Sequence, residues 1–168
     1  MRQNEFEERA EQILRDHNLL SLPIDPVVLA SRENIVVRNA KFSDDSIAGA
    51  LSRRGDSISM LIAADDANAR KRFSVAHELG HHFLGHIGED QDLIDHVDDM
   101  YRAEFAEFEK SGRDRKEIAA NQFAAALLMP ATLVRQQWQI TPSVDLMAKS
   151  FQVSLEAMGY RLSSLGVL

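Results

Sequence analysis

Three residues in one short segment have the types and the spacing of a metal site. His77 and His81 lie four positions apart, and Glu78 directly follows the first histidine. On an α-helix, residues four apart differ by only about 40° around the axis, so both imidazoles can converge on one ion. Glu78 lies about 60° from His81 and can reach a water molecule there as a general base. The segment therefore predicts a divalent-metal site with its own base.

The element that must carry these residues is a helix from about 66 to 86, which is predicted from a stripe of apolar residues. An HExxH pattern on an apolar helix that follows a strand is the usual context of zincin metallopeptidases. The alternative interpretation is a solvated helix with histidines on its surface.

A third ligand is needed, because catalytic zinc normally has three protein ligands. An extended metzincin motif would place glycine at position 84 and histidine at position 87, where the chain has Leu84 and Ile87. Gly85 and His86 are each displaced by one residue, which excludes that motif. His82 and His86 are better interpreted as surface residues or as partners of the ligands.

Glu117 is the better third ligand, because it begins an otherwise apolar helix that Pro130 stops. Asn121 lies four residues further on the same face and can brace a ligand histidine through its other ring nitrogen. From these residues alone, solvation of Glu117 in the first helical turn is an open alternative.

Composition limits the other choices. The chain of 168 residues has no cysteine, which excludes thiolate ligands, disulfides and cysteine nucleophiles. Its net charge of −7 disfavours broad binding to nucleic-acid backbones. The N-terminal segment lacks the apolar core of a signal peptide, and no apolar run is long enough to span a membrane. These features predict a cytoplasmic protein without a membrane partner.

The predicted fold class is α+β, with a small antiparallel or mixed sheet packed on the HExxH helix. The segments expected to be strands are residues 35–37, 46–53 and 57–63. Ser59, Met60 and Leu61 in the last of these are predicted to form an edge on which an extended peptide substrate pairs. Residues 88–110 are acidic and are interpreted as a solvated connection, with a helix near 98–109 and a role as a lid.

Residues 139–168 are predicted to form a short helical segment of helix-turn-helix proportions, packed on a metallopeptidase domain of residues 1–138. From position 141 onward the only basic residues are Lys149 and Arg161, and the charges of Asp145 and Glu156 offset theirs. Direct binding of nucleic acid is therefore not expected.

The chain resembles the ImmA/IrrE family of bacterial metallo-endopeptidases over most of residues 20–165. The matching stretches are residues 47–51, 72–81, 117–130 and 147–162. The resemblance implies a zincin-like domain with one Zn²⁺ per chain, for which Mn²⁺ is a substitute. It also implies that His77, His81 and Glu117 bind the metal, as in gluzincins, and that Glu78 is the catalytic base.

The same resemblance implies a substrate class. Members of the family cleave helix-turn-helix repressors of the Xre type and so de-repress phage, mobile-element or stress-response genes. Two other classes stay open: a non-catalytic regulatory module that keeps the zincin fold, and a DNA-binding regulator. The intact Glu78 argues against the first, and the acidic charge argues against the second.

Overall fold

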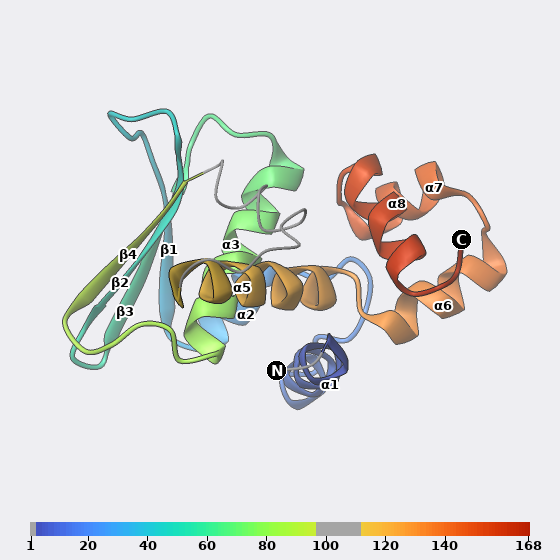
Figure 1. Cartoon of the computed structure of the whole chain (residues 1–168), viewed down its shortest axis with the longest axis horizontal. Coiled ribbons are helices and arrows are strands. Elements are labelled where there is room, and N and C mark those ends of the chain that lie inside the picture. The colour runs from blue at the N-terminus through green and yellow to red at the C-terminus, as the bar shows by residue number, and fades with distance from the viewer. Residues whose placement is uncertain (1–2, 97–111) are drawn as a thin grey trace.

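The computed structural model describes residues 3–96 and 112–168, and within them the chain forms seven helices and a four-stranded sheet (Figure 1). In chain order the elements are α1 (Gln3–Asp16), α2 (Pro26–Arg32), β1 (Ile35–Ala40), β2 (Ile47–Arg54), β3 (Ser57–Ala63), α3 (Asn68–Phe83), β4 (Gln91–His96), α5 (Gly112–Leu128), α6 (Ala131–Ile140), α7 (Val144–Phe151) and α8 (Leu155–Ser164). Helix α3 packs on the sheet and α5 packs on α3, while α6–α8 gather at the far end of the molecule from the sheet (Figure 1). The predicted α+β class is confirmed.

The sheet has the strand order β1-β3-β2-β4, in which β1 and β3 are parallel and the other pairs are antiparallel. Met60 at the centre of β3 is opposite Val37 of β1 on one side and Leu51 of β2 on the other. The prediction that β3 is a free edge for a substrate is therefore wrong, because neighbouring strands occupy both of its backbone edges. Among the described strands, β1 and β4 are the outer ones.

Strand β4 occupies part of the segment that the sequence indicated as a solvated connection. It pairs with β2, and the register shifts between Ile47 and Gly49, so that Asp95 lies opposite Gly49. Such irregularities bend a strand and redirect its side chains. Asp95 is buried while its neighbour Ile94 is exposed, so β4 aims a carboxylate into the protein. The helix predicted near 98–109 lies outside the described residues.

Helices α3 and α5 approach each other closely at a glycine. A β-carbon on Gly80 would lie 3.0 Å from the Cα atom and the carbonyl oxygen of Ala120. Real Cβ atoms rarely come so near backbone, so a larger residue at position 80 would push the helices apart. Helix α3 ends just before Gly85, whose φ of +69° allows the left-handed conformation that commonly follows a helix.

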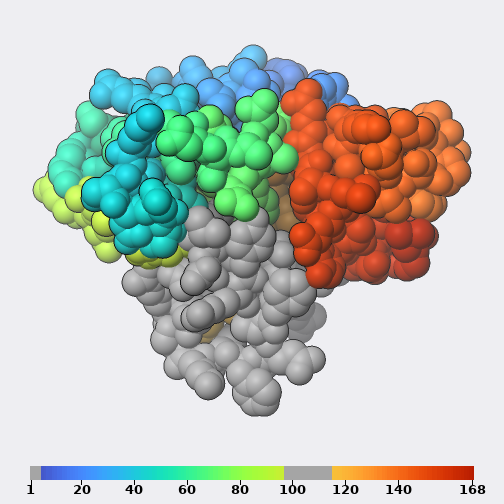
Figure 2. Space-filling view, turned by 90° about the horizontal axis from the view of Figure 1, so that it is seen from above, coloured from blue at the N-terminus to red at the C-terminus, as the bar shows by residue number. Residues whose placement is uncertain are grey.

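The C-terminal helices form a lobe beside the start of α3 (Figure 2). The buried side chain of Arg161 on α8 donates hydrogen bonds to the carbonyl oxygen of Met129 and forms an ion pair with Glu7 of α1. Met147, Phe151, Met158 and Leu162 belong to the same hydrophobic core as the rest of the chain. Helix α6 runs across the domain boundary predicted at 138, and that division stays a prediction.

In the described parts of the chain, no single helix combines the length and hydropathy needed to cross a membrane. Within these parts, residues Arg115–Leu128 of α5 and helix α6 reach that length and hydropathy only when they are taken together, and the two helices are bent by 44° relative to each other.

Candidate metal centre

Helix α3 brings the two histidines of the HExxH segment together in the interior. Both imidazoles are almost fully buried, and their Nε2 atoms lie 3.0 Å apart. Valine, alanine and leucine residues around them are buried as well, so this stretch of the helix lies in the core. The arrangement is the convergence that the four-residue spacing predicts.

Two carboxylates from other elements complete the cluster. The Oε2 atom of Glu117 on α5 lies 3.2 Å from Nε2 of His77 and 3.6 Å from Nε2 of His81. The Oδ2 atom of Asp95 on β4 lies 3.4 Å and 3.6 Å from the same nitrogens. All four residues are buried, and their four ligand atoms lie within 4.8 Å of one another.

Asp95 was not among the ligands predicted from sequence. Its segment is short and acidic, and only the pairing of β4 with β2 reveals which of its side chains point inward. The sequence around Asp95 shows no alternation of apolar and polar residues, because the apolar Ile94 lies between Leu93 and Asp95. An aspartate in an acidic stretch is also normally solvated.

Asn121 holds the ring of His77 in a defined orientation. Its Oδ1 atom lies 2.7 Å from Nδ1 of His77, and both side chains are buried. An amide oxygen can only accept, so Nδ1 of His77 carries the proton and donates it. When the ring of His77 is neutral, its lone pair is therefore on Nε2, the atom that faces Glu117 and Asp95. This is the bracing position that the sequence predicts for Asn121.

His86 occupies the corresponding position beside the second histidine, with its Nδ1 atom 3.0 Å from Nδ1 of His81. Burial and the charges of His81 and Lys116 lower the pKa of His86 to about 4, so its ring is neutral near pH 7. A neutral His86 can accept the Nδ1 proton of His81, which again leaves Nε2 free. His82 points elsewhere and lies 3.3 Å from Glu33.

Glu78 is buried next to the cluster in a space that a glycine leaves open. A β-carbon on Gly49 would lie 2.5 Å from Oε1 of Glu78. The Oε2 atom is buried and has no hydrogen-bond partner in the described structure. Burial and the charge of Asp95 raise the pKa of Glu78 well above its usual range. Glu78 is thus a confined and desolvated carboxyl group whose protonated form is favoured by its surroundings.

The electrostatics of the cluster favour a bound cation. Burial alone would lower the pKa of His77, but its contacts with Asp95 and Glu117 outweigh this effect and raise the pKa to about 10. Burial would likewise raise the pKa of Glu117, but its close contacts with His77 and His81 lower it. Without a metal ion, these shifts favour a proton on His77 beside the ionised carboxylate of Glu117. A bound cation would supply the positive charge in place of that proton.

The donor set fits a divalent metal ion. The inward oxygens of Asp95 and Glu117 are buried without a hydrogen-bond partner among the described groups. Buried charges of one sign are costly unless a counter-charge pairs with them. Imidazole nitrogens together with carboxylate oxygens are ligands that zinc accepts. These four residues, called the metal-binding cluster below, could therefore hold a divalent metal ion.

The residues predicted to bind substrate do not join this cluster. Ser59, Met60 and Leu61 lie on the interior strand β3, and Met60 is completely buried. The outer strand nearest the cluster is β4, which contributes Asp95.

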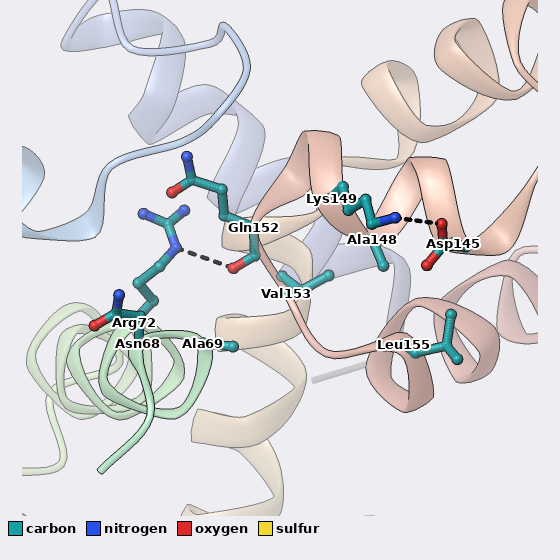
Figure 3. Close-up of a pocket in the computed structure, with 9 residues that line it drawn as sticks. All are labelled: Asn68, Ala69, Arg72, Asp145, Ala148, Lys149, Gln152, Val153 and Leu155. Carbon is teal, nitrogen blue, oxygen red and sulfur yellow. Dashed lines mark hydrogen bonds and ion pairs between the residues drawn. The ribbon is translucent and has the colours of Figure 1, made fainter. Parts of the chain in front are cut away.

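A separate surface pocket of about 470 Å³ lies between the start of α3 and the helices α7 and α8 (Figure 3). Arg72 on one wall donates to the carbonyl oxygen of Gln152 on the other, and Lys149 is paired with Asp145. None of the lining residues belongs to the metal-binding cluster. The pocket marks the junction of the C-terminal helices with α3.

The fold and the buried cluster define the class as a metallopeptidase-like domain. The chain belongs to the Peptidase_M78 family, because the family model described as the IrrE N-terminal-like domain matches residues 30–163. This confirms the resemblance to the ImmA/IrrE family that the sequence motifs indicated.

One similar solved structure is a "Mycobacterium tuberculosis transcriptional regulator", with a TM-score of 0.66 and 19% sequence identity. The match covers 95% of this chain but only 47% of the regulator chain, and at this identity it shows the fold alone. No curated protein matches the sequence significantly.

Proposed function

We propose that this chain is a zinc-dependent endopeptidase that cleaves a helix-turn-helix transcriptional repressor. The observation that carries the proposal is the buried carboxyl of Glu78 beside the cluster of His77, His81 and Glu117. A protein that only bound metal for stability would not require a desolvated carboxyl group with an unpartnered oxygen at this point.

The residues divide the chemistry between them. His77, His81 and Glu117 would hold the zinc ion, with Mn²⁺ as a substitute. A bound divalent ion supplies Lewis-acid polarisation of a peptide carbonyl. Glu78 takes the proton of the attacking water and passes it to the leaving amine. Asn121 fixes the ring of His77 so that Nε2 stays available.

Support for a protein regulator as substrate comes from the family and from the C-terminal helices. Repressor cleavage is what the ImmA/IrrE resemblance implies, and a similar structure carries the name of a transcriptional regulator. The two basic residues after position 141 each form an ion pair with an acidic residue of the same chain. Lys149 pairs with Asp145, and Arg161 pairs with Glu7. These helices therefore favour a protein partner over nucleic acid, and a repressor substrate would place the reaction in the cytoplasm.

The test is cleavage of the repressor encoded beside the gene for this chain. Wild type, Glu78→Gln and the exposed control Glu89→Gln are purified, loaded with zinc and assayed for metal content and cleavage products. We expect one zinc per chain in all three and cleavage only by wild type and the control. A zinc-loaded wild type that binds the repressor without cleaving it, equally well after chelation, would instead establish a non-catalytic module.

A further inference from the structure

Asp95 reaches the cluster through the irregular pairing of two strands. The register shift between β2 and β4 sets Asp95 opposite Gly49, and Gly49 is also the residue that makes room for Glu78. Asp95 is 2% exposed, although the adjacent Ile94 is 48% exposed. The sheet thus places one carboxylate against the face of α3 that carries His77 and His81.

The four inward atoms are spaced closely enough to surround one metal ion. Five of their six mutual distances, which join the two Nε2 atoms to each other and to Oδ2 of Asp95 and Oε2 of Glu117, lie between 3.0 and 3.6 Å. The sixth distance, between the two carboxylate oxygens, is within 4.8 Å. A tetrahedral zinc with ligands at about 2.0–2.1 Å has edges of about 3.3–3.4 Å. Asp95 fits this spacing as well as Glu117 does.

The charges around Asp95 also favour its role as a metal ligand. Oδ2 of Asp95 is buried without a hydrogen-bond partner, and no lysine or arginine pairs with Asp95, Glu117 or Glu78 in the described part of the chain. Two carboxylates and two neutral imidazoles around a divalent ion form a neutral unit. Such a unit is easier to bury than an isolated carboxylate.

We propose that Asp95 is a fourth protein ligand, and that the described conformation is a closed, latent form of the metal centre. The proposal rests on the proposed function only in requiring that the cluster bind a metal. Structural zinc sites use four protein ligands, whereas catalytic sites keep one position open. Release of Asp95 is then the step that opens the site to water and substrate, and β4 is the element whose displacement controls it.

The competing assignment makes Asp95 the partner of Glu78 in sharing a proton. Their proximity raises the pKa of Glu78, which is compatible with that role. The two assignments differ in what happens to the metal when Asp95 changes. A ligand contributes to metal affinity and closes the coordination sphere, whereas a proton-sharing partner does neither.

The experiment loads the full chain with Co²⁺, whose visible bands report coordination, and adds azide as a probe for an open position. Wild type, Asp95→Asn and Asp95→Ala are compared with Asp92→Asn, a control on the same strand whose exposed side chain pairs with Arg54. Zinc affinity is measured in parallel by competition with a chelating dye.

We expect the wild-type and Asp92→Asn cobalt spectra to be unchanged by azide, and the spectra of both Asp95 variants to shift. Zinc affinity of the Asp95 variants should fall at least about tenfold. The proposal is overturned if azide shifts the cobalt spectrum of wild type, a result that needs no variant to fold, or if zinc affinity is the same in all four proteins. A wild type that takes up neither zinc nor cobalt would overturn the proposed function together with this proposal, which distinguishes the two failures.

Discussion

The Oδ1 atom of Asn121 lies 2.7 Å from the Nδ1 atom of His77, and this contact joins helix α5 to the edge of helix α3 that carries both histidines. It fixes the tautomer of His77 and the direction of its ring. Partners of this kind typically contribute a factor of about 10–100 to metal affinity. We therefore expect Asn121→Ala to weaken zinc binding by that factor without unfolding the chain. The neighbouring exposed Gln122→Ala is the matched control, and equal zinc affinity in both variants would show that the brace is not needed.

Gly80 determines how closely α3 and α5 can pack. A methyl group there would meet the backbone of Ala120 at 3.0 Å, so Gly80→Ala must separate the helix of His77 and His81 from the helix of Glu117. We expect the free energy of unfolding to fall by about 1–3 kcal/mol, and zinc affinity to fall with it. Denaturant unfolding and dye competition measure the two effects.

The control for that variant is Gly159→Ala on helix α8, where an added β-carbon meets nothing within 4 Å. Replacing a helical glycine without steric cost should raise stability by about 0.5–1 kcal/mol. A change of stability in the same direction in both glycine variants would contradict a close contact between α3 and α5 at Gly80.

A side chain added at position 49 is expected to displace the carboxyl group of Glu78 without displacing His77, His81 or Glu117. An alanine β-carbon would lie 2.5 Å from Oε1 of Glu78, and the end of that side chain can move where backbone cannot. Gly49→Ala should therefore fold and bind zinc, yet cleave its substrate about 100-fold more slowly, since general base catalysis is worth at least that much. Ala50→Ser, whose side chain points to the opposite face of β2, serves as control. Full activity of Gly49→Ala would show that Glu78 does not need its present position.

Arg161 joins the C-terminal helices to the rest of the chain. It is buried, donates to the carbonyl oxygen of Met129 and pairs with Glu7. Arg161→Ala leaves both partners unsatisfied and should lower the free energy of unfolding by about 3 kcal/mol. Lys149→Ala removes only an exposed ion pair and should change it by less than about 1 kcal/mol. A single unfolding transition in wild type is expected, and separate transitions for the two parts would contradict this packing.

Local sequence patterns predict the central helix and the side chains that converge at it, for physical reasons. The positions of His77, Glu78 and His81 follow from helix geometry, and the apolar residues around Glu117 and Asn121 indicate which face of α5 is buried. The two strand segments that form β2 and β3 were also predicted, and Gly55 in the turn between them has a φ of +55°.

The features that the sequence did not predict depend on contacts between distant segments. The parallel pairing of β1 with β3 encloses β3, and no local pattern in residues 57–63 encodes that neighbour. Asp95 is buried only because β2 and β4 pair with a shifted register. His86 reaches His81 because the chain turns at Gly85, whereas a continuing helix would carry it away.

The central claim is that one metal ion binds among His77, His81 and Glu117. Crystals of the zinc-loaded chain, with diffraction recorded on both sides of the zinc absorption edge, test it most directly. We predict a single anomalous peak about 2.0–2.1 Å from the Nε2 atoms of both histidines and about 2.0–2.2 Å from a carboxylate oxygen of Glu117. The absence of a peak there after zinc addition, or a peak at other residues only, would contradict the account.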